Sequence, residues 1–335
     1  MTREEILLRR LRGQYLLSPG DCKTVIQDLC GVQAQFLSHA LHGLTIRCQD
    51  IETSALVKSW TIRGTMHLFS PEDLPLFLHK GRTHFLRPVD TMDEDRFCTA
   101  TRKAYFAEHI LAAVAGGMDQ RESLKIYCQE KGITETESRS LFDPWGGLIR
   151  ALCEEGKLCH KAQEKKAYRL CPSFTPMEEE PARLEMARRY FTHFGPATIR
   201  DAAYFFGCTQ KRVKFWLRQL PVQETVLDGR AYYNLDLGSA PAGNLPECLF
   251  LAGFDQLLLG YEKTESLILP REYLREIFTL SGIVRPALLI RGQVAGWWKK
   301  QGKTLQVKLL SSAERHLVES SAPALWPDLG KVQYV

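Results

Sequence analysis

Residues 195–235 read GPATIRDAAYFFGCTQKRVKFWLRQLPVQETVLDGRAYYNL, and this stretch decides the class of fold. Its apolar spacing predicts a helix over 199–206 that ends at a glycine. A second helix is expected over 209–220, beginning at a threonine, a residue type that caps helices. The pair Asp228-Gly229 predicts that residues 222–235 fold back as a β-hairpin. Two helices followed by a hairpin are typical of a winged-helix unit.

A similar series comes earlier in the chain. Helices are expected over residues 121–131 and 145–155, followed by a hairpin over 158–171 with the charged tip Glu164-Lys165-Lys166. An acidic stretch bounded by prolines, 176–181, separates the two series and predicts a linker. The repeated series favours an array of winged helices over a single module.

Beyond residue 246 the pattern changes to short strands. Runs over 288–291, 293–299 and 304–310 alternate in part and are separated by glycine-containing turns, and a helix is expected over 271–279. The expected fold class is α+β, mainly α, with tandem winged-helix domains, each a helix-turn-helix plus a β-hairpin wing, and a small C-terminal antiparallel β domain. The expected boundaries are 1–117, 118–181 and 182–240 for three winged-helix units and 241–335 for the β-rich domain.

The composition is that of an ordinary globular chain, with 335 residues and a net charge of +5. Its ten cysteines never lie closer than six positions apart, which argues against a zinc ribbon or a compact cysteine-ligated cluster. His39 and His42 have no companions at metal-ligand spacing, so we expect no metal and no cofactor. The N-terminus is charged and no run approaches about 18 apolar residues, so we expect a cytoplasmic protein with reduced thiols and no membrane contact.

The segment Gly31-Val32-Gln33-Ala34-Gln35 places two neutral amides in an apolar context. An amide that is left unpaired away from water costs about 1–3 kcal/mol, so such a pair is solvated, hydrogen-bonded or aimed at a ligand. On a regular helix these two positions point about 200° apart. Both amides therefore reach one site only if the backbone bends or ends there, and Gly31 would allow that.

The helix expected over 209–220 has two distinct faces. One is an apolar stripe and the other is basic; the residues are Val213, Trp216, Leu217 and Leu220 on the first, and Lys211, Lys214 and Arg218 on the second. A recognition helix that contacts DNA has this arrangement. A solvated basic face, or a helix that binds protein, would look the same.

Three residues after Trp60 alternate in sequence: Arg63, Thr65 and His67. Along an extended segment they would share one face, because side chains alternate along a strand. They would then line a cleft. The competing interpretation pairs Arg63 with a carboxylate and makes His67 a satisfied interior histidine.

Four segments carry a family resemblance: Gly31 to Gln35, Trp60 to Leu68, Gly253 to Tyr261, and Gly282 to Pro286. Together they span nearly the whole chain, in the expected order, and resemble the bacterial winged-helix DNA glycosylases of the AlkZ/YcaQ type. Gln33-Ala34-Gln35 matches the AlkZ-like branch, whereas the YcaQ-like branch has an aspartate at the second polar position.

The resemblance implies hydrolysis of the N-glycosidic bond of alkylated purines, with Gln33 and Gln35 as catalytic residues. It also implies that Arg63, Thr65 and His67 hold the DNA backbone or sugar. An N7-alkylated purine already carries a positive charge and needs little acid catalysis to leave, so a glutamine carbonyl has only to hold a water. Whether bulky adducts and interstrand crosslinks are substrates stays open.

We expect a monofunctional enzyme, because no lysine is placed to form a Schiff base. The expected partner is double-stranded DNA with alkylated purines, bound by a monomer that associates with the nucleoid. Asp255 could act as acid or base, but it could also cap a helix or pair with Arg285, and we favour the structural role. The rival functions are a winged-helix transcriptional regulator without enzymatic activity and a protein-interaction scaffold.

Overall fold

The computed structural model describes residues 1–335 except 83–97, 144–146, 164, 236–237, 239–242 and 311–313. The chain forms two compact units, Met1–Ile51 with Met186–Val335, and Glu52–Glu185. The first is called the outer-chain unit and the second the mid-chain unit. The four domains expected from the sequence are a finer division than these two units and stay a prediction. Trp145 and Glu164, which were expected in a helix and at a hairpin tip, lie outside the described residues.

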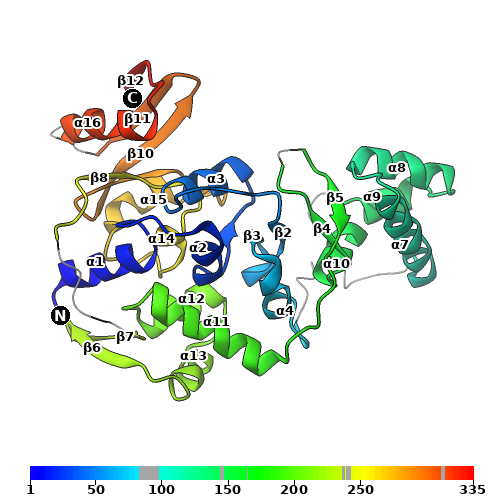
Figure 1. Ribbon diagram of the computed structural model, residues 1–335, viewed down its shortest axis with the longest axis horizontal. Coiled ribbons are helices and arrows are strands. Elements are labelled where there is room, and N and C mark those ends of the chain that lie inside the picture. Colours follow the sequence, from blue (N-terminus) through cyan, green and yellow to red (C-terminus); the bar gives the residue numbers. More distant parts are fainter. Residues whose placement is uncertain (83–97, 144–146, 164, 236–237, 239–242, 311–313) are drawn as a thin grey trace. The chain divides into compact units, whose positions relative to one another are not determined.

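The mid-chain unit combines helices with a sheet in which β3, β2, β4 and β5 are neighbours (Figure 1). Its elements are β2 (Val57–Trp60), η1 (Ile62–Gly64), β3 (Met66–Phe69), η2 (Pro71–Asp73), α4 (Leu74–Phe77), α7 (Ala100–Ala115), α8 (Arg121–Glu130), α9 (Glu135–Leu141), α10 (Gly147–Glu154), β4 (Leu158–His160) and β5 (Tyr168–Leu170). These strands pair antiparallel. The predicted helix over 121–131 and hairpin over 158–171 are confirmed.

Local capping explains where these helices begin. The Thr99 side chain accepts the backbone N–H of Arg102 at the start of α7. Thr134 and Glu137 form a reciprocal capping box at the start of α9. The apolar faces of α7, α8 and α10 then meet in one core, which includes Phe106, Leu124 and Leu152.

The outer-chain unit begins with α1 (Arg3–Gly13), α2 (Cys22–Asp28), β1 (Val32–Gln33) and α3 (Leu37–Thr45). Helix α11 (Glu179–His193) enters it from the mid-chain unit. The linker expected over 176–181 is wrong from Glu179 onward, because α11 already begins there. Two glutamates and Pro181 occupy its first turn, where acidic residues and proline are both tolerated.

The stretch 195–235 folds as predicted. Helices α12 (Ile199–Phe206) and α13 (Gln210–Leu217) are followed by the hairpin of β6 (Gln223–Leu227) and β7 (Arg230–Asn234). Gly207 ends α12 in a left-handed conformation, with φ of 62°. Asp228 and Gly229 close the hairpin with φ of 50° and 74°, as a type I′ turn requires.

The C-terminal sheet has the order β12-β11-β10-β9-β8. Its strands are β8 (Cys248–Phe250), β9 (Ala287–Ile290), β10 (Gln293–Gln301), β11 (Thr304–Leu309) and β12 (Lys331–Tyr334), and its helices are α14 (Gln256–Leu259), η3 (Arg271–Tyr273), α15 (Leu274–Ile277) and α16 (Arg315–Leu325). The strands β8 to β11 pair antiparallel, as predicted.

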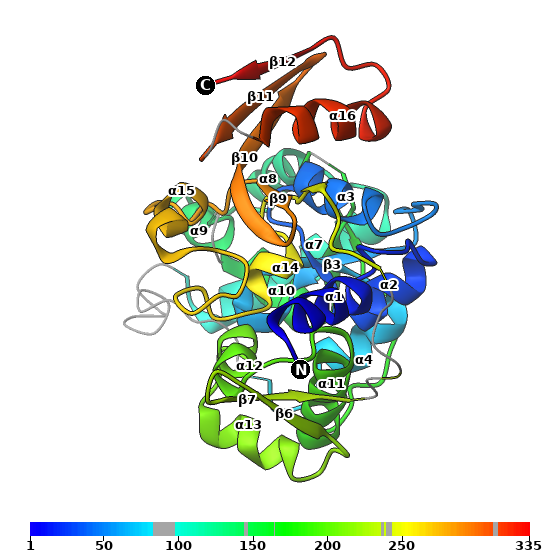
Figure 2. The ribbon, with the colours of Figure 1, turned by 90° about the vertical axis from the view of Figure 1, so that its left-hand side faces the viewer.

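The prediction of a purely antiparallel domain is wrong at the last strand, because β12 pairs parallel to β11. Helix α16 lies between them in the chain and packs beside the sheet (Figure 2). A crossover of this kind returns the chain in the same direction, which parallel pairing requires. The protein is thus a mixed α+β fold.

Candidate active site

The glutamine segment lies just after a break in the backbone. Helix α2 ends at Asp28, and Cys30 and Gly31 then adopt left-handed conformations with φ of 55° and 77°. Their backbone N–H groups donate to the carbonyls of Gln27 and Ile26, at 3.1 and 2.8 Å, and so close the helix. From Val32 the chain is extended. The backbone therefore ends its helix just before the motif, as the two amides require.

The two glutamines have different surroundings. Gln33 is buried, with 7% of its surface exposed, whereas Gln35 is exposed. Val32 and Ala34 on either side of Gln33 are buried apolar residues. Among the residues that the structure describes, none forms a hydrogen bond with the Gln33 side-chain amide. A mostly buried amide without a protein partner is costly to keep, which makes Gln33 a candidate for contacting a ligand.

A second segment of the chain supports this turn from behind. The Gln256 side-chain amide, itself 3% exposed, donates to the backbone carbonyl of Gly31. Its neighbour Asp255 forms a two-pronged ion pair with Arg47, with Nη2–Oδ1 of 2.7 Å and Nη1–Oδ2 of 3.0 Å. Both side chains of this pair are almost fully buried, at 1% and 0% exposure.

Asp255 has a structural role in this geometry. Its carboxylate also accepts the N–H of Leu257 at 2.8 Å, which caps α14, and the N–H of Ala252 at 3.3 Å. The expected helix cap is therefore confirmed, but the expected partner is wrong. Arg285 lies 3.5 Å from Glu276 instead, and Arg47 takes its place beside Asp255. The contacts around Asp255 occupy both of its oxygens and give no support to an acid or base role.

Aromatic side chains lie next to the motif, and sequence reasoning missed them. Phe36 directly follows Gln35, is 42% exposed, and stacks on Phe254 with ring centroids 5.7 Å apart. His39 lies at the edge of both rings, 5.9 Å from Phe36. A Cβ at Gly253 would lie 2.9 Å from the His39 ring, so a glycine is required there. Exposed rings of this kind can stack on nucleic-acid bases, and an aromatic residue beside a polar motif is the signal that could have shown them.

In the mid-chain unit, Arg63 does not lie in an extended segment, so the expected alternation is wrong at this residue. It occupies the 3₁₀ turn η1 with φ of 56°, and Gly64 follows with φ of 65°. Thr65 is extended and leads into β3. The left-handed pair reverses the chain before the strand begins, so only Thr65 and His67 share the alternation.

His67 is an interior residue with 2% exposure, and its Nδ1 donates to the carbonyl of Thr65 at 3.0 Å. Burial, assisted by the charge of Arg63, lowers the pKa of His67 to about 3. The ring is therefore neutral and cannot bind phosphate as a cation. Thr65 in turn donates from Oγ1 to the carbonyl of Ile62 at 3.0 Å. The competing interpretation of His67 as a satisfied interior histidine agrees with this geometry.

Two arginines that sequence reasoning missed stabilise the same turn. Arg150 Nη2 donates to the carbonyl of Gly64 at 3.3 Å, and its guanidinium lies 5.3 Å from the Trp60 ring. Arg82 Nη2 donates to the carbonyl of Trp60 at 2.7 Å. Because these donors come from distant parts of the sequence, no local pattern indicates them. Gln33 and Arg63 belong to different units, each described by itself, so their meeting in one cleft stays a prediction.

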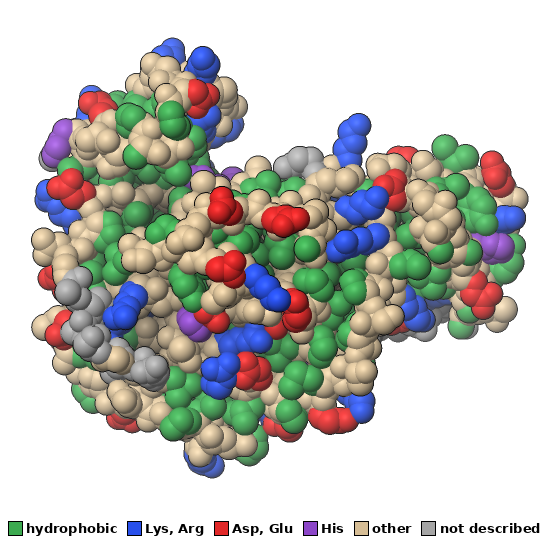
Figure 3. All heavy atoms as spheres, in the orientation of Figure 1, with side chains coloured by type: hydrophobic (Ala, Val, Ile, Leu, Met, Phe, Trp, Pro, Cys, Tyr) green, Lys and Arg blue, Asp and Glu red, His purple; other side chains and the backbone are tan. Residues whose placement is uncertain are grey.

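The basic face expected on α13 is exposed. Val213 and Trp216 are buried, while Lys211, Lys214 and Arg218 are exposed, and no ion pair with any described residue engages these three. On the face drawn in Figure 3, Lys and Arg side chains are interspersed with Asp and Glu. Binding of an anion would therefore depend on local groups such as these and not on one uniform field.

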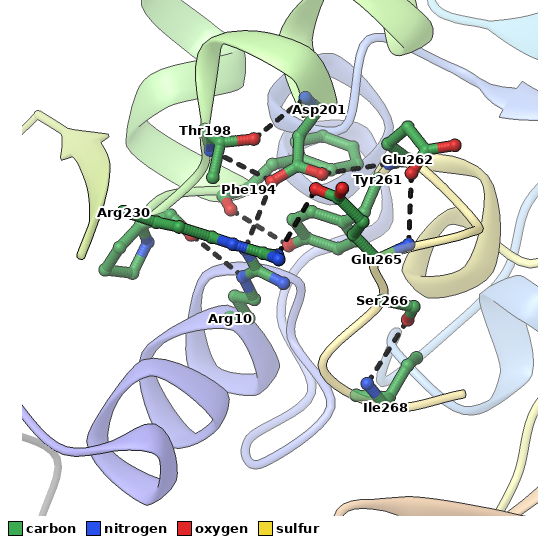
Figure 4. A network of polar contacts seen from close by, with 12 residues as sticks. Arg10, Phe194, Thr198, Asp201, Arg230, Tyr261, Glu262, Glu265, Ser266 and Ile268 are labelled. Carbon is green, nitrogen blue, oxygen red and sulfur yellow. Dashed lines mark hydrogen bonds and ion pairs between the residues drawn. The ribbon is translucent and has the colours of Figure 1, made fainter. Parts of the chain in front are cut away.

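A further polar cluster of the outer-chain unit is shown in Figure 4. Arg10, 2% exposed, donates to the carbonyl of Pro196 at 2.8 Å, contacts Asp201 at 3.5 Å, and lies 3.8 Å from the Tyr261 ring centroid. Asp201 also accepts the N–H of Glu262 at 2.9 Å, and Glu265 pairs with Arg200 and Arg230. Opposite charges compensate one another here, so the cluster connects α1, α12 and the segment after α14 structurally.

No group of three or more His, Cys, Asp or Glu in the described ranges could hold a metal ion. Among the helices that these residues form, none is long and apolar enough to cross a membrane.

Comparison with known proteins gives one consistent result. The family model "DNA glycosylase AlkZ-like" matches residues 26–329. The chain is 25% identical to the interstrand DNA cross-link repair glycosylase of Streptomyces sahachiroi, over 93% of this chain and 91% of that protein. It also resembles the solved structure of Streptomyces sahachiroi DNA glycosylase AlkZ, with a TM-score of 0.78 and 22% identity over 99% of this chain and 98% of the other. The chain belongs to the AlkZ-like DNA glycosylase family.

Proposed function

We propose that this protein is a monofunctional DNA glycosylase that hydrolyses the N-glycosidic bond of N7-alkylated, cationic purines, with Gln33 and Gln35 as its catalytic pair. The observation that carries the proposal is the Gln33 side chain, which is mostly buried and has no partner among the described residues. Family membership supplies the reaction class. The exposed Gln35, two residues further on, provides the second amide.

The chemistry asks little of these groups. The C1′–N bond of the cationic nucleoside breaks, its electron pair neutralises the departing base, and a water oxygen bonds to C1′ and releases a proton to solvent. The Gln33 carbonyl accepts a hydrogen bond from that water and orients it, and the Gln35 amide donates to the sugar or phosphate. Amides are weak bases, so turnover is modest and neutral purines are poor substrates.

DNA contacts come from side chains that remain outside the catalytic pair. Arg63 and Thr65 hold the backbone from the mid-chain unit, with His67 as a neutral support behind them. Lys211, Lys214 and Arg218 contact phosphates from α13, where all three are exposed. The protein acts as a monomer, and double-stranded DNA draws it to the nucleoid. Bulky N7 adducts and interstrand crosslinks are included in the proposed range, since the Streptomyces sahachiroi relative is named as a cross-link repair glycosylase.

The test is excision of a single N7-methylguanine from a duplex, read as alkali-labile strand breaks. Gln33→Ala is expected to lower the excision rate about 100-fold, as the loss of one orienting group does in other active sites. Gln35→Ala should lower it less, because this side chain is exposed. Gln27→Ala, a glutamine of α2 just before the motif, is the matched control and should excise like the wild type.

The exposed basic face of α13 also favours a second candidate, a DNA-binding regulator. If the wild type binds DNA but releases neither N7-methylguanine nor a bulkier or crosslinked adduct, the regulator replaces the enzyme. DNA binding that hardly changes with salt would instead favour a protein-interaction scaffold.

A further inference from the structure

The contact between Gln256 and Gly31 joins residues that are 225 positions apart in the sequence. Gln256 is the first residue of α14, and 3% of it is exposed. The Gly31 carbonyl that accepts its amide belongs to the peptide unit that leads into Val32. Because a peptide unit is planar, holding this carbonyl also sets the direction in which the Val32 N–H and the following strand leave the turn.

This hold acts where the backbone is least determined by its own preferences. Cys30 is a non-glycine residue with φ of 55°, and Gly31 follows with φ of 77°. A left-handed cysteine is disfavoured by about 1 kcal/mol or more, and glycine adopts many conformations with similar energy. Left alone, this pair would sample other conformations and would turn Gln33 away from its observed direction. An external contact is therefore needed to select one of them.

The part of the chain that carries Gln256 is itself rigid. Asp255 caps α14 and forms the buried ion pair with Arg47. Arg47 further donates to the backbone carbonyls of Gln14 and Gly43, at 3.1 and 2.9 Å. Position 256 is thus fixed to α1 and α3 before its amide reaches Gly31.

We propose that Gln256 is a positioning residue for the catalytic glutamines, acting through the Gly31 carbonyl. Gln256 does not contact substrate; it holds the turn so that the Gln33 amide points in one direction. The proposal rests on the function proposed above, and its test is designed so that the two can fail separately.

The first measurement compares Gln256→Met with Gln293→Met. Methionine keeps the length of the side chain and removes the donor. Gln293 is a matched control, because its amide also donates to backbone carbonyls, those of Leu267 and Gly292 at 2.9 and 3.0 Å, but lies on β10 away from the motif. Gln256→Met should lower the single-turnover excision rate about 10- to 100-fold, as small misplacements of reacting groups do. Its dissociation constant for lesion DNA should stay within about twofold of the wild type.

The second measurement needs no activity. Hydrogen exchange of the peptide that covers residues 30–36 should be faster in Gln256→Met and unchanged in Gln293→Met. Equal exchange in both variants, or equal loss of excision in both, overturns the positioning role. If the wild type excises nothing while the exchange difference is present, the proposed function fails and Gln256 still holds the turn.

Discussion

The turn at Cys30-Gly31 and the turn at Arg63-Gly64 have nearly the same backbone, with φ of 55° and 77° in the first and 56° and 65° in the second. In both, a distant side chain donates to the glycine carbonyl, Gln256 in the first and Arg150 in the second. The polar side chains beyond the two turns differ in their partners. Beyond the second turn, Thr65 and His67 make short local hydrogen bonds to the backbone.

Beyond the first turn, the amide of Gln33 is mostly buried and no described residue bonds to it. Two turns of the same shape thus serve different ends: one presents an unpaired polar group and the other satisfies its polar groups locally. Polar groups that are not satisfied in a folded protein are the exception, and they gather where ligands bind. The backbone alone does not distinguish the two turns; the hydrogen bonds around them do.

The largest expected effect breaks the support of the first turn. Arg47→Met leaves Asp255 as an unpaired charge in a site where both side chains are almost fully buried. The free energy of unfolding should fall by about 3–5 kcal/mol in urea titrations. Arg285→Met is the matched control, since its pair with Glu276 is partly exposed and should contribute no more than about 1 kcal/mol. Equal losses in the two variants would contradict the distinction.

The second effect concerns acid and acts on the second turn. Burial lowers the pKa of His67 to about 3, and that of His160 in the same unit likewise. The unfolded chain takes up protons below about pH 6.5 while these folded rings do not, so stability is full above that pH and falls toward pH 3. Between pH 6.5 and 5 each ring should contribute a loss of about 2 kcal/mol.

His67→Asn should therefore show a smaller stability difference between pH 7 and pH 5 than the wild type. His316→Asn, at an exposed position of α16, is the control and should keep the wild-type difference. A His67→Asn difference as large as that of the wild type would show that this ring does not remain neutral in the folded state.

A third prediction sharpens the contrast between satisfied and unsatisfied groups. Gln33→Leu replaces the unpaired amide by an apolar group of similar size and should stabilise the protein by about 1 kcal/mol. Thr65→Val removes a hydroxyl that donates to the carbonyl of Ile62 and should destabilise it by about 1 kcal/mol. Thermal unfolding of both variants measures the signs. If Gln33→Leu also destabilises, the Gln33 amide has a structural partner and the contrast fails.

The smallest effect concerns the charge on the second turn. Arg63→Ala should reduce the salt dependence of DNA binding by about one unit of slope, because one phosphate contact is lost. Arg63→Lys keeps the charge and should keep the slope. Binding isotherms at several salt concentrations give both values. An unchanged slope in Arg63→Ala would mean that Arg63 acts only within the protein.

Much of the architecture could be predicted from local patterns. Thr198, Gly207 and Asp228-Gly229 mark a helix start, a helix end and a hairpin turn, and each works through neighbours within a few residues. The extended conformation expected at Arg63 was wrong, since a left-handed non-glycine residue needs support that only Arg150 and its surroundings provide. The parallel strand β12 was missed for a related reason, because strand direction depends on the intervening helix.

The sequence by itself determined where helices and hairpins form and which family the Gln33-Ala34-Gln35 motif resembles, because capping, periodicity and turn chemistry act over short distances. Only the tertiary structure decided that Asp255 pairs with Arg47, that Gln256 holds the Gly31 carbonyl, and that Gln33 is buried while Gln35 is exposed. Burial and hydrogen bonding between segments more than 200 residues apart depend on how the elements pack, and no local spacing records that.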